Sequence, residues 1–157
     1  PQFRPDPTTR PGPLYLMWDW FRKILGRDSR PTNLVRGSLG EDSALEHLRA
    51  QGLVLLARNY RGGPGEIDLI LRDPECVIFV EVKTRSAGGW LRPAAAVNLR
   101  KRRLLSASAL QYLRQSGNPK VRIRFDIVEV LLRDGKVSEV RHLTNAFPLE
   151  GKTTYAV

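Results

Sequence analysis

The sequence is poor in the residues that build disulfides and zinc sites. It has one cysteine and two histidines among 157 residues. Cys76 cannot form a disulfide within the chain, and it lies in an apolar run where we expect a small core residue. No zinc-ligand spacing exists, because zinc sites need clustered cysteines and histidines. No apolar run approaches the roughly 20 residues that span a bilayer. These absences exclude a disulfide scaffold and a zinc enzyme, and they favour a reducing cytoplasmic setting.

Acidic residues are scarce relative to basic ones. Lysine and arginine number 26 against 16 aspartates and glutamates, which gives a net charge of +10 and a pI near 10.5. Most of the excess is arginine, whose planar guanidinium suits bidentate contacts with phosphate. The charge therefore predicts a polyanionic partner, DNA in the first place, with RNA not excluded. The alternative is that the charge serves only solubility.

Residues 1–36 differ in composition from the rest. The first part is basic and proline-rich, and residues 14–25 have the apolar spacing of a short amphipathic helix. We expect this helix to pack on the domain rather than to contact a membrane. Met17 is the only methionine and a candidate start of translation. The sequence thus predicts an N-terminal arm over 1–36 and one domain over 37–157.

The domain has alternating helix and strand patterns. We expect a helix from Ser38, closed by Gly52, and a second one over 93–115 with Val97, Leu104, Ala107 and Leu110 toward its buried side. The predicted strands are 53–60, 66–71, 76–84, 121–132 and 136–143. The order αβββαβ, followed by one further strand, predicts an α/β fold with helices flanking a mixed sheet.

Two of these predicted strands carry ionisable residues in otherwise apolar runs. Asp68 lies on one, and Glu81 and Lys83 lie on the next. Side chains two positions apart share a face of a strand, so Glu81 and Lys83 emerge together. An unpaired buried charge costs several kcal/mol, and a shared Mg²⁺ or Mn²⁺ would offset that cost. Asp68, Glu81 and the Val82 carbonyl are candidate ligands, with Lys83 placed to orient a water. One metal and two metals both fit.

Alternatives stand beside this interpretation. Glu41 is a candidate fourth acid, but Ser38-x-x-Glu41 also fits a capping box in which Glu41 bonds only the backbone. Glu66 fits a ligand or a partner of Arg58 or Arg61. Asp68, Glu81 and Lys83 also fit a structural ion pair with an acidic neighbour.

Several basic residues are candidates for phosphate contact. Such contacts hold nucleic acid without reading its sequence. Asp126 shares a strand face with Arg124 and is a candidate partner for it. The candidate nucleic-acid-binding residues are Arg58, Arg61, Arg85, Arg100, Lys101, Arg102, Arg103 and Arg124.

A family resemblance rests on these motifs in combination. The stretch from Gly40 to Phe147 resembles the YraN-type family of predicted bacterial endonucleases, which are similar to archaeal Holliday junction resolvases within the PD-(D/E)xK superfamily. The matching segments are Gly40-Glu41, Arg58-Asn59-x-Arg61, 65–70, 79–83 with Arg85, Lys101, 124–126 and 145–147. This chain departs from the pattern at Trp90-Leu91 and near Ala95.

The resemblance implies a restriction-endonuclease-like core and a catalytic set of Glu41, Asp68, Glu81 and Lys83. It implies a Mg²⁺-dependent endonuclease acting on DNA, including branched or structured DNA. The alternative is a non-catalytic nucleic-acid-binding module that retains the fold. A homodimer fits two-strand cleavage, although no residue demonstrates one.

Overall fold

The computed structural model describes residues 35–86 and 97–151 of the chain. The predicted helix over 14–25, Met17, Trp90, Leu91 and Ala95 lie outside these ranges, as does nearly all of the predicted arm. Within them, neither helix is long and apolar enough to cross a membrane.

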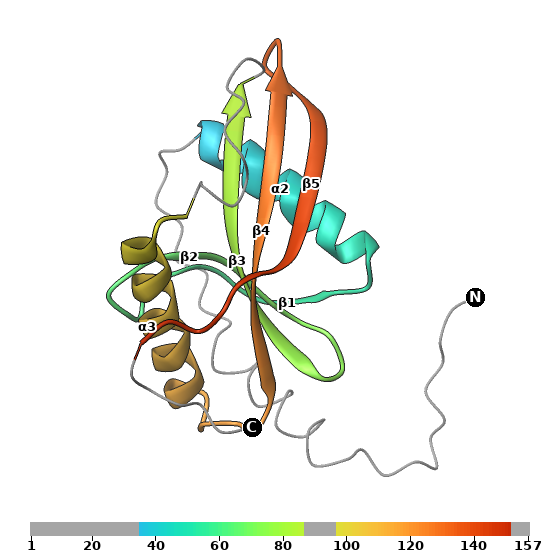
Figure 1. Ribbon diagram of the computed structural model, residues 1–157. Coiled ribbons are helices and arrows are strands. Elements are labelled where there is room, and N and C mark those ends of the chain that lie inside the picture. The colour runs from blue at the N-terminus through green and yellow to red at the C-terminus, as the bar shows by residue number, and fades with distance from the viewer. Residues whose placement is uncertain (1–34, 87–96, 152–157) are drawn as a thin grey trace, which may run out of the picture. The chain divides into compact units, whose positions relative to one another are not determined.

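Two helices and five strands make up the described part of the chain (Figure 1). Their order matches the predicted αβββαβ pattern with one added strand. The elements are α2 (Val35–Ala50), β1 (Val54–Tyr60), β2 (Ile67–Arg72), β3 (Cys76–Ser86), α3 (Leu99–Gln115), β4 (Arg122–Arg133) and β5 (Lys136–Phe147).

The five strands form one mixed sheet in the order β1-β2-β3-β4-β5. Neighbouring strands run antiparallel except β3 and β4, which are parallel. A parallel pair needs a long crossover, and the connection that contains α3 supplies it. The predicted α/β fold, with helices flanking a mixed sheet, is confirmed.

Each helix covers a different face of the sheet. We call the side that carries Val80 and Val128 the α2 face, because both pack in one core cluster with Ala44 and Leu48 of α2. The alternate positions point the other way, and there Phe79 meets Tyr112 of α3 with ring centroids 6.0 Å apart. We call this second side the α3 face. Since β3 contributes to both cores, its residues 76–81 are all buried.

Three predicted boundaries need correction. Helix α2 begins at Val35, so Ser38 lies inside the helix and not at its N-cap. Helix α3 begins at Leu99 rather than at 93, because the Asn98 side chain accepts a hydrogen bond from the Lys101 N–H, 2.9 Å away, and caps it there. Strand β5 continues past 143 to Phe147.

Of the residues predicted on the buried side of this helix, Val97 is buried but lies before α3, and the other three need correction. Leu104, Ala107 and Leu110 are only partly buried, whereas the inward residues include two serines. Serine was not expected there, but its hydroxyl is satisfied: Ser106 Oγ accepts from the Glu150 N–H at 2.9 Å. The buried residues of the helix are Leu105, Ser106, Ser108, Ala109, Tyr112 and Leu113.

The turn between β1 and β2 is fastened to α3 through Ser108. Its Oγ accepts from the Gly65 N–H at 2.8 Å and donates to the Gly65 carbonyl at 2.9 Å. The backbones are so close that a Cβ on Gly63 would lie 2.6 Å from the Ser108 Cα. This attachment sets the start of β2, the strand that carries Asp68.

Replacing Ser108 by alanine should therefore destabilise the fold. The change leaves the Gly65 N–H and carbonyl unpaired, at a cost of about 1–3 kcal/mol. Urea unfolding of wild type and Ser108→Ala measures the difference. The matched control is Ser138→Ala, an exposed serine that donates to the Leu131 carbonyl, where we expect less than about 0.5 kcal/mol. Equal effects in the two variants would show that the Ser108 contact is dispensable.

Candidate active site

Asp68 and Glu81 face each other across β2 and β3. The last register pair between these strands is Leu69 with Val80, and the next position along the antiparallel ladder brings Asp68 opposite Glu81. Asp68 Oδ2 accepts a hydrogen bond from the Val82 N–H at 2.7 Å. An aspartate side chain thus binds β3 backbone where the ladder stops.

Glu81 is held between two ammonium groups. It is 3% exposed, and its Oε1 lies 2.6 Å from the Nζ of Lys83 on the same strand. Its Oε2 lies 3.3 Å from the Nζ of Lys101, which comes from α3. Lys101 was predicted among the phosphate-binding residues, because nothing in a helical pattern shows which strand residue a lysine reaches.

The Asp68 carboxyl is costly to ionise in this setting. Burial raises its pKa most, and the nearby Glu81 charge raises it further. The Val82 N–H bond and the Lys101 charge oppose these effects, and the pKa reaches about 7. Asp68 therefore changes its charge near neutral pH, where an unperturbed aspartate is fully ionised. Perturbed carboxyl groups of this kind are common at functional sites, and structural ion-pair networks produce them as well.

Glu41 lies at the edge of this group. Its charge contributes to raising the pKa of Asp68, and Arg58 Nη2 lies 3.7 Å from its Oε2. Its side chain is 19% exposed. Because α2 begins at Val35, Glu41 is not the third residue of a helix that starts after Ser38, and the capping-box explanation for this acid is wrong.

The remaining predicted basic residues separate into two groups. Some are engaged with protein groups: Arg58 bonds Asp42 at 2.6 Å, and Arg61 bonds Glu66 at 3.0 Å. Arg102 donates to the Val97 carbonyl and lies over the Phe147 ring. Arg100 and Arg103 are exposed on α3, and Arg85 shares the α3 face with Glu81 and Lys83.

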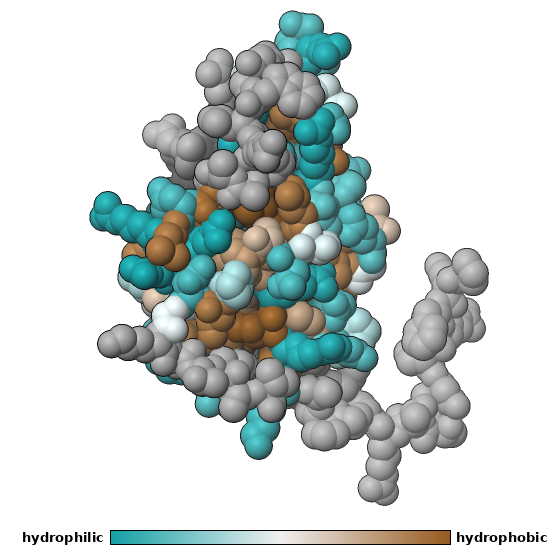
Figure 2. Space-filling model, in the orientation of Figure 1, coloured by the Kyte–Doolittle hydropathy of each residue, from teal (hydrophilic) through white to brown (hydrophobic). Residues whose placement is uncertain are grey.

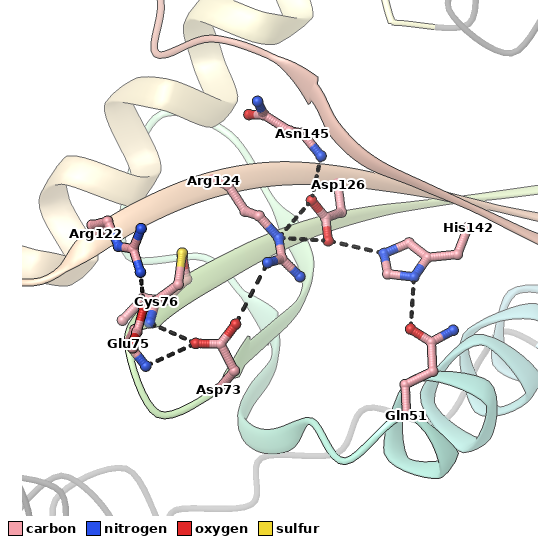
Figure 3. Close-up of polar contacts among 10 residues, drawn as sticks. Gln51, Asp73, Glu75, Cys76, Arg122, Arg124, Asp126, His142 and Asn145 are labelled. Carbon is pink, nitrogen blue, oxygen red and sulfur yellow. Dashed lines mark hydrogen bonds and ion pairs between the residues drawn. The ribbon is translucent and has the colours of Figure 1, made fainter.

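Arg124 lies on the opposite face of the sheet, away from Glu81. It belongs to a polar cluster around Asp126, which is fully buried on the α2 face (Figure 3). Arg124 Nε donates to both Asp126 oxygens at 3.1 Å, as the sequence analysis considered. Its position thus serves the fold rather than the group around Glu81.

Asp126 has two further partners in this cluster. The Asn145 N–H donates to its Oδ1 at 2.8 Å, and the His142 Nε2 lies 2.9 Å from its Oδ2. The other His142 nitrogen lies 3.1 Å from Gln51 Oε1, beyond the end of α2. One carboxylate thereby joins β4, β5 and the end of α2. Sequence reasoning missed His142 and Gln51, since no local pattern relates residues 91 positions apart.

The acids on the α3 face suit a hard cation better than zinc. No group of three histidine, cysteine, aspartate or glutamate side chains within 35–86 and 97–151 is arranged to hold a metal. Mg²⁺, however, binds through one or two carboxylates and keeps several waters. Asp68 and Glu81 supply two carboxylates whose mutual repulsion raises the pKa of Asp68, and a divalent cation would relieve that repulsion. These two residues, with the Val82 carbonyl, fit such an ion.

Comparison with known proteins places this chain among bacterial relatives. The family model described as "Uncharacterised protein family UPF0102" matches residues 40–130. The chain belongs to this UPF0102 (YraN) family. The predicted resemblance is thus confirmed. The matched stretch runs from α2 into β4, so it contains Glu41, Asp68, Glu81, Lys83 and Lys101.

Individual UPF0102 proteins match over most of their length. One from Rhodococcus jostii is 39% identical over 115 residues, which cover 73% of this chain and 98% of the relative. One from Porphyromonas gingivalis is 44% identical over 115 residues, 73% of this chain and 84% of the relative. One from Geobacter sulfurreducens is 37% identical over 117 residues, 74% of this chain and 91% of the relative. These names give the family and no activity.

The raised pKa of Asp68 predicts a stability that falls with rising pH. The unfolded chain releases this proton near pH 4 and the folded chain near 7, so the penalty grows between those values and then stays constant. In metal-free buffer at pH 8, Asp68→Asn should be more stable than wild type by on the order of 1–3 kcal/mol. At pH 3.5 the advantage should vanish. Urea unfolding across this range measures it, and an advantage that does not change with pH would contradict the assignment.

Removing the charge at the centre of the cluster on the α2 face should destabilise the fold strongly, whereas Asp68→Asn should stabilise it. Asp126→Asn removes the charge that Arg124 and His142 face, and breaking a buried ion pair costs about 3–5 kcal/mol. Thermal and urea unfolding test this. Glu139→Gln is the control, because Glu139 pairs with Arg141 at the surface, and we expect it to leave the stability nearly unchanged. A small effect of Asp126→Asn would show that the network is not a structural requirement.

Proposed function

We propose that this protein is a metal-dependent endonuclease that hydrolyses phosphodiester bonds in DNA. The observation that supports the proposal most is the group of Asp68, Glu81 and Lys83 on one face of neighbouring strands. It combines two closely opposed carboxylates with a lysine 2.6 Å from one of them. The family membership is compatible with this activity and names none.

Each group has a role that its position allows. Asp68 and Glu81 would hold Mg²⁺ or Mn²⁺, with the Val82 carbonyl as a further ligand and Glu41 as an outer acid. When bound, the ion supplies charge neutralisation at the phosphate and a more acidic water. Lys83 would orient the attacking water or stabilise charge that develops on the phosphate. Lys101 would hold the Oε2 oxygen of Glu81, 3.3 Å from its Nζ.

The proposed substrate is argued from charge. The net charge of +10 favours a polyanion, and Arg85, Arg100 and Arg103 on the α3 side would contact its backbone. DNA in the cytoplasm is the proposed substrate, with branched or structured DNA as a specific form and RNA as an alternative. A homodimer would cut both strands of a two-fold substrate.

A binding module without cleavage is the second candidate. The observation that favours it is that both Glu81 oxygens already face an ammonium, from Lys83 and from Lys101. These two cations compensate the charge of Glu81 without any metal. The fold would then carry nucleic acid on its basic side and leave the strand intact.

Cleavage of a labelled DNA panel separates the two candidates. The panel contains duplex, single strand, flap and four-way junction, each with Mg²⁺, Mn²⁺ or EDTA. We expect metal-dependent cutting by wild type, and a loss of at least about 100-fold in Asp68→Asn and in Lys83→Ala. RNA versions of the same substrates test the choice of nucleic acid.

Two controls match the charge changes. Glu46→Gln removes an exposed acid of α2. Lys120→Ala removes an exposed lysine just before β4 begins, nine positions from Glu129, the register partner of Lys83. Both should cut like wild type. Tight binding with no cutting under any metal would reject the nuclease in favour of the binding module.

A further inference from the structure

A third acid lies on the α3 face, beside the proposed catalytic group. Glu129 of β4 is 3% exposed and is the register partner of Lys83 in the parallel β3–β4 ladder. Residues paired in register point to the same face, so Glu129 lies on the side of Glu81. Glu129 was not among the predicted site residues, although it too lies within an apolar run.

The Glu129 carboxylate is incompletely matched. Its Oε1 is buried and makes no hydrogen bond, and the same is true of the nearest cationic atom, Arg85 Nε, 3.7 Å away. Leaving a buried charge without hydrogen bonds is unfavourable. The positions before and after it on this face are the apolar Ile127 and Leu131, so packing alone would favour an apolar residue. Glu129 therefore has a role beyond filling space.

Three cations surround Glu129, and two of them are bound to other acids. Lys83 contacts Glu81 at 2.6 Å. Arg141, the register partner on β5, makes two hydrogen bonds to Glu139. Within the described residues, Glu129 is the acid that pairs with Arg85.

The Arg85 side chain is buried at its Nε and exposed farther out. Its Nε is buried, yet its side chain remains 21% exposed, so the outer part of the side chain reaches the surface. Arg85 lies two positions beyond Lys83 on the same face, about 6.5 Å farther along the strand. A phosphate next to the one at Lys83 would lie within its reach.

We propose that Glu129 is a positioning residue that holds Arg85 against the sheet, so that the guanidinium binds a backbone phosphate beside the proposed cleavage point. This inference rests on the proposed function for its ligand. It adds β4 to the site and names an acid whose removal should weaken the binding of a polyanion. Ordinary electrostatics predicts the reverse, because removing a negative charge from a DNA-binding face should strengthen binding.

Because the two expectations for removing Glu129 differ in sign, a binding measurement alone tests the proposal. Fluorescence anisotropy with a labelled four-way junction and a labelled duplex, in EDTA to prevent cutting, gives Kd over a range of KCl concentrations. The variants are Arg85→Ala, Glu129→Gln and the double variant. We expect Arg85→Ala to lower the magnitude of the salt slope by about 0.9, the value of one phosphate contact. Glu129→Gln should reproduce most of that change and weaken binding about 3-fold.

The double variant measures whether the two residues act as one unit. If Glu129 acts through Arg85, the double variant should bind no more weakly than Arg85→Ala. Glu139→Gln is the matched control, since it removes an acid from the same face without contact to Arg85; it should bind as wild type or more tightly. Glu129→Leu is a second variant at this position. Leucine matches the apolar neighbours of Glu129, so it should fit the fold and still show the same loss of binding as Glu129→Gln.

Three results would overturn the inference. They are Glu129 variants that bind as tightly as wild type or more tightly, an unchanged salt slope, and effects that add in the double variant. Wild type that binds DNA but never cuts it would defeat only the proposed function, because the comparison of single and double variants still decides the role of Glu129. Wild type that binds no nucleic acid would defeat both.

Discussion

The central interaction of the described structure is the ion pair of buried Glu81 with two lysines from different elements. Lys83 shares its strand, and Lys101 reaches it from α3. Because the carboxylate is almost wholly removed from water, losing either cation would leave a charge in a poorly polarisable setting. The pair also connects the sheet to α3, and the charge of Lys101 opposes the rise in the pKa of the neighbouring Asp68. The candidate site therefore shares this contact with the attachment of α3 to the sheet, which Ser108 and Tyr112 also provide.

Much of the fold and part of the site could be predicted from the sequence. The alternation along β3 placed Glu81 and Lys83 on one face, and the apolar runs of β2 and β3 predicted neighbouring strands, because both patterns are local. The added strand and the mixed sheet followed from the order of elements. Hydrophobic content of 41% was enough to expect a core. The nearly continuous apolar run of β3 predicted a strand covered on both faces, and residues 76–81 are all buried.

The rest depends on contacts between distant residues or on competition at helix ends. Lys101 reaches Glu81 only because Asn98 starts α3 at Leu99 and sets the rotation of the helix. Ser106 and Ser108 are buried because their hydroxyls meet backbone groups of other segments. Surface hydropathy does not single out the candidate site. In Figure 2, hydrophobic patches lie among hydrophilic residues on the same face, and the β4–β5 turn at its top is hydrophilic.

Strand β4 contains two buried acids, and they point in opposite directions. Asp126 turns to the α2 face and Glu129 to the α3 face, each toward cations of its own side. Sliding β4 by one residue against its neighbours would turn each carboxylate away from the partner that another strand supplies, Asp126 from His142 on β5 and Glu129 from Arg85 on β3. A misaligned strand would thus be rejected by two separate penalties rather than by packing alone. The two acids thus help to fix the register of β4. Insertions between them should be tolerated far less than insertions at the Asp134-Gly135 turn.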